Sequence, residues 1–282
     1  MQLVHTNQEL ASALREARAA GKKIGFVPTM GALHQGHLSL VKLAQEQSDF
    51  VVVSVFVNPK QFGQGEDFDN YPRTLALDAR LLSDHGVDLL YAPSVGEIYP
   101  IDKPVRAMLA GAIGQGFEGA VRPGHFDGML TVVSRLFDLV EPDAVFFGQK
   151  DAQQVALVKN MIREQVSSGV RPPLKLVVGP TIRNENGLAL SSRNKFLTSV
   201  DMPVALSLSR ALFAGSKGAD RDEVLSLAMA EISPEAKLDY LELVDADSFE
   251  PTELGSSPAL LIVAARVGQV RLLDNVLIDR KS

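Results

Sequence analysis

Residues 24–44 read IGFVPTMGALHQGHLSLVKLA, and this stretch decides how the rest of the chain is arranged. The apolar run at 24–27 predicts a strand, and the helical spacing of Leu38, Val41 and Ala44 predicts a helix close behind it. The first backbone N–H groups of a helix lack partners within it, and the macrodipole places partial positive charge there. A strand, a turn and a helix N-terminus in this order therefore predict an anion site.

Two histidines stand at the start of this predicted helix. His34 and His37 are three residues apart, so their side chains share one face of the first turn. Gly31 and Gly36 let a ligand approach the main chain because they lack a Cβ atom. A simpler interpretation is that one histidine caps the helix and the other is solvated. We favour nucleotide binding, because two imidazoles beside an anion-binding helix end suit a phosphate chain.

Composition limits the class of protein. The chain has 282 residues, 46% of them apolar and 22% charged, which suits one large or two ordinary globular domains. The net charge of −6 argues against a general nucleic-acid partner. The absence of cysteine excludes disulfides, thiolate catalysis and Cys-ligated zinc. Residues 1–15 lack the apolar core of a signal peptide, and no stretch approaches ~18 uninterrupted apolar residues, so we expect a cytoplasmic protein that crosses no membrane.

Short apolar strands alternate with helices as far as residue 178. Strands are predicted at 24–27, 50–57, 88–92, 143–147 and 174–178, and helices at 7–20, 75–85, 129–140 and around 155–162. This alternation predicts an α/β domain with a parallel sheet and right-handed crossovers.

The pattern changes after residue 178. Helices are predicted at 203–214, where Pro203 suits the first helical position, and at 222–232. Strands follow at 238–244, 259–267 and 270–278 without helices between them, which predicts an antiparallel α+β unit. We therefore expect two domains, 1–178 and 179–282.

Polar clusters follow several predicted strands, at the sheet edge where open parallel sheets bind ligands. These clusters are His34 with His37, Asn58 with Gln61, and Gly148 to Asp151. Lys150 could lie on a phosphate, and Asp151 could hold a ribose hydroxyl or act through a metal. Alternatively, Lys150 and Asp151 form a solvated pair at a helix start.

Two further polar groups are candidates for substrate contacts. Gln153 and Gln154 are uncharged and suit hydrogen bonds to hydroxyl or carboxylate groups, or they are ordinary surface glutamines. Ser191, Ser192 and Arg193 offer two hydroxyls and a fork of donors that suit phosphate oxygens, although alone they would be an ordinary turn.

The glycine-rich segment 97–127 is interpreted as a flexible loop over a site. Residues 114–119 match G-x-G-x-x-G by letter, but the Arg-Pro-Gly sequence at 122–124 blocks the helix that a dinucleotide site needs. We therefore reject the dinucleotide interpretation. Arg122 and His125 could close over a substrate from this loop.

The chain offers no nucleophile with a base beside it: it has no cysteine, no G-x-S-x-G and no P-loop. This fits chemistry in which the substrate's own carboxylate attacks a phosphate, so that the protein supplies positioning and charge stabilisation. Three aspartates could bind Mg²⁺, namely Asp67, Asp69 and Asp78, but their spacing matches no site built from protein ligands alone. Magnesium usually enters such a site bound to substrate phosphates. We therefore name no protein ligand for a metal.

Six motifs in order together resemble the pantothenate synthetase (pantoate–β-alanine ligase) family. They are PTMGALHQGH at 28–37, NPKQFG at 58–63, YPRT at 71–74, RPGHF at 122–126, FGQKDAQQ at 147–154 and LSSRN at 190–194. Residues 200–282 agree with the family in length and layout only.

The resemblance implies a Rossmann-like nucleotidyltransferase domain with a smaller C-terminal α+β lid domain, assembled as a homodimer. It implies that (R)-pantoate and β-alanine are condensed to pantothenate, a step of the coenzyme A pathway, with ATP as a substrate and Mg²⁺ carried on its phosphates. The carboxylate of pantoate would attack the α-phosphate to give a pantoyl-adenylate, and the amine of β-alanine would displace AMP.

The resemblance also assigns residues. His34, His37, Lys150 and Arg193 would be catalytic; His37 is usually called the proton donor, but we interpret it mainly as a stabiliser of phosphate charge. Gln61 would contact pantoate and β-alanine, and Gln154 pantoate. ATP would contact Met30, Gly31, Ala32, Leu33, His34, Gln35, Gly36, His37, Gly148, Gln149, Lys150, Asp151, Ile182, Leu190, Ser191, Ser192 and Arg193.

Two other classes of protein share part of this pattern. A nucleotidyltransferase of the same superfold would transfer AMP or CMP to a phosphorylated acceptor and keep the nucleotide in its product. A regulator would bind ATP without turnover. Gln61 and Gln154 favour the ligase, because a small hydroxy acid needs neutral hydrogen-bond partners.

Overall fold

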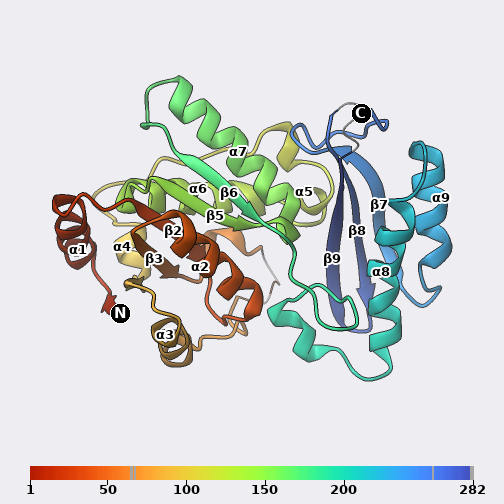
Figure 1. Cartoon of the computed structure of the whole chain (residues 1–282), viewed down its shortest axis with the longest axis horizontal. Coiled ribbons are helices and arrows are strands. Elements are labelled where there is room, and N and C mark those ends of the chain that lie inside the picture. Colours follow the sequence, from red (N-terminus) through yellow and green to blue (C-terminus); the bar gives the residue numbers. More distant parts are fainter. Residues whose placement is uncertain (64–65, 67, 256, 280–282) are drawn as a thin grey trace. The chain divides into compact units, whose positions relative to one another are not determined.

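The computed structural model describes residues 1–63, 66, 68–255 and 257–279 of the chain (Figure 1). These residues divide into two compact units. The first consists of residues 1–148 and 157–179, and the second of residues 149–156 and 180–282.

A six-stranded parallel sheet forms the centre of the first unit, which confirms the predicted fold class. Its strands lie in the order β1-β4-β3-β2-β5-β6, and each neighbouring pair is parallel. Strand β1 is three residues long, too short for the alternation pattern to reveal it. The strands are β1 (Gln2–Val4), β2 (Ile24–Thr29), β3 (Phe50–Val55), β4 (Leu89–Tyr91), β5 (Ala144–Gly148) and β6 (Lys175–Gly179).

Helices cover both faces of this sheet. On one face, Val27 of β2 and Val53 of β3 join a buried cluster with Val41 of α2 (Gln35–Gln47). On the other face, Phe26 packs edge-on against Phe137 of α6 (His125–Val140), with 6.5 Å between ring centroids. The remaining helices are α1 (Asn7–Ala19), α3 (Leu75–Asp84), α4 (Val95–Ile98), α5 (Glu118–Val121) and α7 (Ala152–Ser167), which begins among residues of the second unit.

The G-x-G-x-x-G letters at 114–119 do not form a dinucleotide turn. The first of them, Gly114, ends a 3₁₀ turn, Ala112–Gly114, and not a strand. A Cβ atom on Gly119 would stand 1.8 Å from the carbonyl oxygen of Gly114, so these glycines serve a close approach of the loop to itself.

The second unit combines three antiparallel strands with two helices, as predicted (Figure 1). Its strands are β7 (Lys237–Asp245), β8 (Ala259–Val267) and β9 (Val270–Ile278), and its helices are α8 (Asp201–Gly215) and α9 (Arg221–Glu231). Leu208 and Leu212 of α8 and Val224 of α9 share one buried cluster with Leu261 and Val263 of β8.

Helix α8 begins two residues earlier than predicted, so Pro203 is not its first residue. Thr198 and Asp201 explain the shift. The Asp201 carboxylate accepts the Thr198 N–H at 3.0 Å, and the Thr198 hydroxyl accepts the Asp201 N–H at 3.2 Å. This reciprocal pair forms the turn from which the helix continues at Asp201. Among the helices that the structure describes, none is long and apolar enough to cross a membrane.

Candidate functional site

The turn after β2 is built around Gly31. Its φ of +84° is a conformation that glycine adopts without strain, and a Cβ atom there would stand 2.9 Å from Cγ1 of Val55. The Thr29 hydroxyl accepts the Gly31 N–H at 3.1 Å and donates to the Ser54 carbonyl at 2.7 Å. The turn is therefore tied to strand β3, its neighbour in the sheet.

A buried carboxylate holds the next two residues of this turn. Asp78, only 3% exposed, lies in α3 and accepts the N–H groups of Ala32 at 3.0 Å and Leu33 at 2.9 Å. The Thr74 hydroxyl also donates to it, at 3.1 Å. These contacts hold Ala32 at a φ of +52°, which costs a non-glycine residue conformational energy.

Asp78 is thus a structural acceptor and not an open magnesium ligand. Of the other two aspartates considered for Mg²⁺, Asp67 lies outside the described residues, and the carbonyl of Asp69 accepts the Arg73 guanidinium at 3.2 Å. In the part of the chain that the structure describes, no group of three or more His, Asp or Glu side chains is placed to hold a metal.

His34 and His37 form a reciprocal cap on α2. Nδ1 of His34 accepts the Gly36 N–H at 3.1 Å, and Nδ1 of His37 accepts the His34 N–H at 3.3 Å. The ring centroids are 4.2 Å apart. Because a neutral imidazole with Nδ1 as acceptor carries its proton on Nε2, each neutral ring is a donor at Nε2.

This cap corrects one expectation from the sequence. We expected the first N–H groups of α2 to be unpaired, but that of Gly36 bonds to the His34 ring and that of His37 to the His34 carbonyl at 2.8 Å. A Cβ atom on Gly36 would stand 2.9 Å from Cε1 of His34, so glycine is needed here for the histidine cap. Capping and a ligand-facing role are compatible, because they use different ring nitrogens.

Gln61 is held at the end of the next strand, β3. It ends the 3₁₀ turn η1 (Pro59–Gln61), and it is 7% exposed. Nδ2 of Asn58 donates to Oε1 of Gln61 at 3.1 Å and to the Gly128 carbonyl at 3.1 Å. Nε2 of Gln61 reaches the sulfur of Met30 at 3.0 Å. The contact with Met30 links the turn after β3 to the turn after β2.

Arg122 and His125 fix the main chain of Gln61. Nδ1 of His125 lies 2.8 Å from the Gln61 carbonyl oxygen, and Nε2 lies 3.1 Å from Nη1 of Arg122. Two 2.7 Å bonds join Arg122 to Glu66. Burial, and then the charge of Arg122, lower the pKa of His125, while the hydrogen bond from Arg122 lowers the pKa of Glu66. Arg122 and His125 therefore support Gln61, and their closure over a substrate stays a prediction.

Two of the predicted polar clusters lie at one edge of the sheet of the first unit. His34 with His37 follow β2, and Asn58 with Gln61 follow β3; the two strands are neighbours in the sheet, so the turns after them leave the same edge. The third cluster belongs to the second unit from Gln149 onward. Gly148 ends β5 and pairs with Gly179 at the end of β6. His34, His37 and Gln61 all follow this edge.

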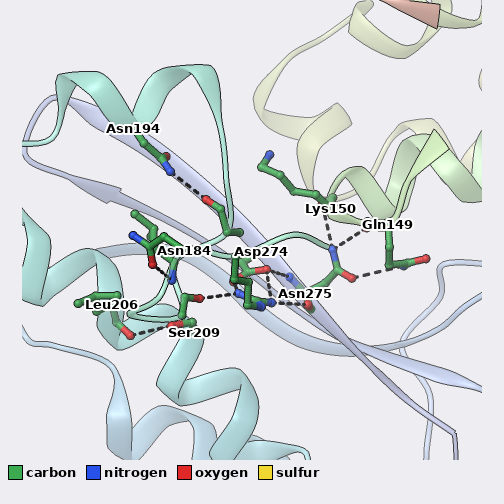
Figure 2. A network of polar contacts seen from close by, with 12 residues as sticks. Gln149, Lys150, Asn184, Asn194, Leu206, Ser209, Asp274 and Asn275 are labelled. Carbon is green, nitrogen blue, oxygen red and sulfur yellow. Dashed lines mark hydrogen bonds and ion pairs between the residues drawn. The ribbon is translucent and has the colours of Figure 1, made fainter. Parts of the chain in front are cut away.

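The second unit contains the turn η3 (Gln149–Asp151) that follows Gly148. Lys150 Nζ lies 3.4 Å from Oδ1 of Asp151, so the two form the pair that we considered as an alternative to phosphate and ribose contacts. Figure 2 shows the side chain of Asn275, from β9, directed at this turn. Its Nδ2 donates to the carbonyls of Gln149 and Lys150, at 2.9 Å each.

The two glutamines at the start of α7 differ in exposure. Gln153 is 4% exposed, and Gln154 is half-buried. The partial exposure of Gln154 leaves it accessible to a ligand, which Gln153 is not.

The predicted phosphate-contacting turn follows a short hairpin. The Leu190 N–H donates to the Ile182 carbonyl at 2.9 Å. Ser191 caps the 3₁₀ turn η4 (Ser192–Phe196), because its hydroxyl oxygen accepts the Arg193 N–H at 3.3 Å. Ser192 and Arg193 are half-buried. The second unit therefore presents two turns with candidate ATP contacts, η3 and η4.

Sequence reasoning missed the residues that support these turns. The sequence alone suggests Asp78 only as a metal ligand, and it gives no reason to select Asp274, Asn275 or Tyr99. The Tyr99 hydroxyl donates to Oδ1 of Asn58 at 2.8 Å, and burial raises its pKa. Only Asp78 has a signal in the sequence, because it is an aspartate in the first turn of a predicted helix, four residues after Thr74.

Comparisons with known proteins agree with this arrangement. A family model described as pantoate-beta-alanine ligase matches residues 2–277. A pantothenate synthetase from a Nocardioides species is 47% identical and covers 97% of this chain and 84% of its own length. Another, from Moorella thermoacetica, is 45% identical and covers 99% of both chains.

Solved structures show the same fold. Pantothenate synthetase from Thermus thermophilus superposes with a TM-score of 0.90 at 43% identity, over 99% of this chain and 100% of the other. Pantoate-beta-alanine ligase from Francisella tularensis, solved with beta-gamma ATP and beta-alanine, gives a TM-score of 0.79 at 37% identity, over 99% and 98% of the two chains. The chain therefore belongs to the pantoate–β-alanine ligase family.

Proposed function

We propose that this protein condenses (R)-pantoate with β-alanine in an ATP-dependent reaction that passes through a pantoyl-adenylate. The observation that carries the proposal is the family match over residues 2–277. The Francisella tularensis relative was solved with beta-gamma ATP and beta-alanine, which correspond to two of the three substrates.

The histidine cap supports a role on the phosphates. With Nδ1 of each ring accepting a backbone N–H, the neutral rings of His34 and His37 can donate from Nε2 to phosphate oxygens. They stand at the N-terminus of a 13-residue helix, whose macrodipole favours negative charge. We assign them to stabilise charge that develops on the ATP phosphates.

The two glutamines suit the smaller substrates. Asn58 holds the side chain of Gln61, and His125 holds its carbonyl oxygen. Gln61 is therefore oriented before substrate arrives. We assign Gln61 to pantoate and β-alanine, and the half-buried Gln154 to pantoate. An amide both donates and accepts, as a hydroxy acid requires.

Lys150 and Arg193 are the proposed cations on the phosphates. Arg193 offers a planar fork of donors and Lys150 a point charge. Mg²⁺ would enter as part of the substrate MgATP and neutralise phosphate charge. We also propose that residues 179–282 act as a lid, since an acyl-adenylate must be kept from water until the amine arrives.

The chemistry has two steps. A carboxylate oxygen of pantoate attacks the α-phosphorus, the bond to the bridging oxygen breaks, and diphosphate leaves. The amine of β-alanine then attacks the acyl carbonyl, AMP leaves with its phosphate oxygen, and the amine loses a proton. The first step needs no protein nucleophile, which fits a site whose contribution is position and charge.

Pyrophosphate release tests the reaction directly. We expect release from the purified protein to require pantoate but not β-alanine, because adenylation precedes amide formation. Equal release without pantoate would refute the proposal. Mass spectrometry of the product distinguishes a nucleotidyltransferase, which would leave the nucleotide in its product.

Paired substitutions separate capping from charge stabilisation. His34→Asn keeps a good helix cap, and His37→Gln keeps an acceptor at the third helical position, yet both remove the imidazole. We expect ~100-fold lower kcat with little loss of stability, the usual scale for one lost transition-state donor. His34→Ala, which removes both functions, should also lower the melting temperature. Native kcat in His34→Asn and His37→Gln would show that the rings act only as caps.

Two further proposals come from the resemblance. We propose a homodimer and a cytoplasmic location. Analytical ultracentrifugation of the purified protein tests the first, and fractionation of the source cells with an antibody tests the second. A monomer at micromolar concentration, or enrichment outside the cytoplasm, would contradict them.

A further inference from the structure

Asn275 is a buried amide whose polar atoms are all directed at one turn. It is 4% exposed and lies in β9. Its Nδ2 donates to the carbonyls of Gln149 and Lys150, at 2.9 Å each, and its Oδ1 accepts a hydrogen bond from Nε2 of Gln149 at 3.3 Å (Figure 2). An amide has two donor hydrogens, so the turn uses both of them.

These bonds orient the peptide groups of η3. In a trans peptide the carbonyl and the following N–H point in opposite directions. Because the carbonyls of Gln149 and Lys150 face Asn275, the N–H groups of Lys150 and Asp151 are turned away from it. Asn275 thereby sets the direction of the main chain that carries the Lys150 side chain.

The preceding residue fixes the second candidate segment. Asp274 is 6% exposed and makes a two-bond ion pair with Arg183, with 2.9 Å between Oδ1 and Nη2. Arg183 also donates to the Gly187 carbonyl at 3.1 Å and to the Asn275 carbonyl at 3.3 Å. Arg183 lies in the hairpin that joins Ile182 to Leu190 and leads into η4.

We propose that Asn275, supported by Asp274, is a positioning residue for ATP. Two successive residues of one strand hold two turns that are far apart in sequence, η3 directly and the approach to η4 through Arg183. The inference rests on the proposed function, in which Lys150 and Arg193 contact the nucleotide. Asn275 acts on ATP only through the main chain of η3.

Asn275→Asp is the sharpest test, because it changes the shape of the side chain little and replaces the NH2 group, which donates both hydrogen bonds, with an oxygen that can only accept. A carboxylate would then face two carbonyl oxygens and turn them away. We expect the dissociation constant of a non-hydrolysable ATP analogue, measured by calorimetry, to rise about tenfold, with a similar fall in kcat for pyrophosphate release, on the scale that misplaced catalytic groups show. The KM for β-alanine should stay within about twofold, because its proposed contact is Gln61.

Asn184→Asp is the matched control. The same change of amide to carboxylate is made in the same unit, but there the side-chain oxygen is the acceptor, from the N–H groups of Asn186 at 3.1 Å and Leu188 at 2.9 Å. A carboxylate keeps both bonds, so we expect native nucleotide affinity and native kinetics.

The outcomes separate this inference from the proposed function. Native analogue affinity in a folded Asn275→Asp protein would overturn the positioning role while leaving the ligase assignment intact. So would an equal loss for every substrate together with a lower melting temperature, since that is the mark of a merely structural residue. If the native protein bound no ATP analogue, both proposals would fail.

Asn275→Ser, which keeps one donor, receives the same measurements if the aspartate variant does not fold. An intermediate rise in the dissociation constant supports the role, and an unchanged one overturns it. Failure of both variants to fold would also overturn it, because it would show that the amide serves the fold as a whole.

Discussion

Replacing Gly128 by alanine tests whether packing of α6 against η1 places Gln61. A Cβ atom on Gly128 would stand 2.0 Å from the carbonyl oxygen of Lys60 and 2.8 Å from the nitrogen of Gln61. Both are backbone atoms, so no change of rotamer relieves the contact. The Gly128 carbonyl also accepts Nδ2 of Asn58 at 3.1 Å, so any shift of α6 disturbs the side chain that holds Gln61.

The geometry gives the size of the effect. The shortest ordinary van der Waals contact is 3.4 Å, so the two backbones must separate by roughly 1.4 Å. Overpacking of this kind costs ~1–3 kcal/mol, whereas alanine for glycine within a helix gains about 1 kcal/mol. The free energy of unfolding should therefore fall by only about 0–2 kcal/mol. A shift of about 1 Å in a substrate-positioning group can cost ~100-fold in rate, so function should suffer more than stability.

Two assays on the same preparation check this expectation. Urea unfolding gives the stability, and pantoate-dependent pyrophosphate release gives kcat/KM for pantoate, which we expect to fall by ~10–100-fold. Gly96→Ala is the control, because Gly96 is an exposed residue of α4. A Cβ atom added there would stand 3.8 Å from its nearest neighbour, Oγ of Ser94. A Gly128→Ala protein with native kcat/KM would refute the reasoning, whatever its stability, because Gln61 would then tolerate the shift.

Three further substitutions or conditions follow from the same contacts. Lys150→Ala should lower kcat for pyrophosphate release more than ATP affinity, and a KM effect with unchanged kcat in steady-state assays would contradict the assigned role. Asp78→Ala leaves the N–H groups of Ala32 and Leu33 without their buried acceptor, so urea unfolding should show a loss of ~1–3 kcal/mol, while an unchanged midpoint would contradict it. Burial, and then Arg122, lower the pKa of His125 below its usual 6.5, so the unfolded chain binds the proton more readily than the folded one. The contribution of His125 to the free energy of unfolding is complete above pH 6.5 and is lost as the pH falls below that value. Urea unfolding between pH 5 and 8 should show this loss in the native protein and a smaller loss in His125→Asn.

The parts of the fold that could be predicted are those in which one short stretch carries its own signal. Strand β3 is apolar at every position except Ser54, because a central strand of a parallel sheet is buried on both faces. Helix α6 shows its buried stripe within 16 residues. Strand β1, with three residues, gives no such pattern. The start of α8 differs from the prediction for another reason, because the reciprocal hydrogen bonds between Thr198 and Asp201 form a turn before Pro203, from which the helix continues.

The sequence could place the candidate residues at one edge of the sheet, but it could not reveal the groups that support them. His34, His37 and Gln61 follow predicted strands, so topology alone places them at one edge of the sheet. The double histidine cap cannot be predicted from the sequence, because histidine is not among the preferred capping residues and only the close approach of the His34 ring to Gly36 shows why it fits. Asp78 holds N–H groups 45 and 46 residues away, and Asn275 holds a carbonyl 125 residues away. No local pattern encodes such distances.

These supports share a physical cause. The candidate residues His34, Gln61 and Lys150 lie on turns just after strands, where neither sheet nor helix satisfies the main chain. A buried main-chain group without a partner is costly. The partner must therefore be a side chain, and its chemistry follows from the exposed group. Asp78 accepts because its turn presents N–H groups, whereas Asn275 donates because η3 presents carbonyls. An Asp–Asn exchange at either position inverts that match while hardly changing volume, so its cost reports the polarity of the turn and not the packing around it.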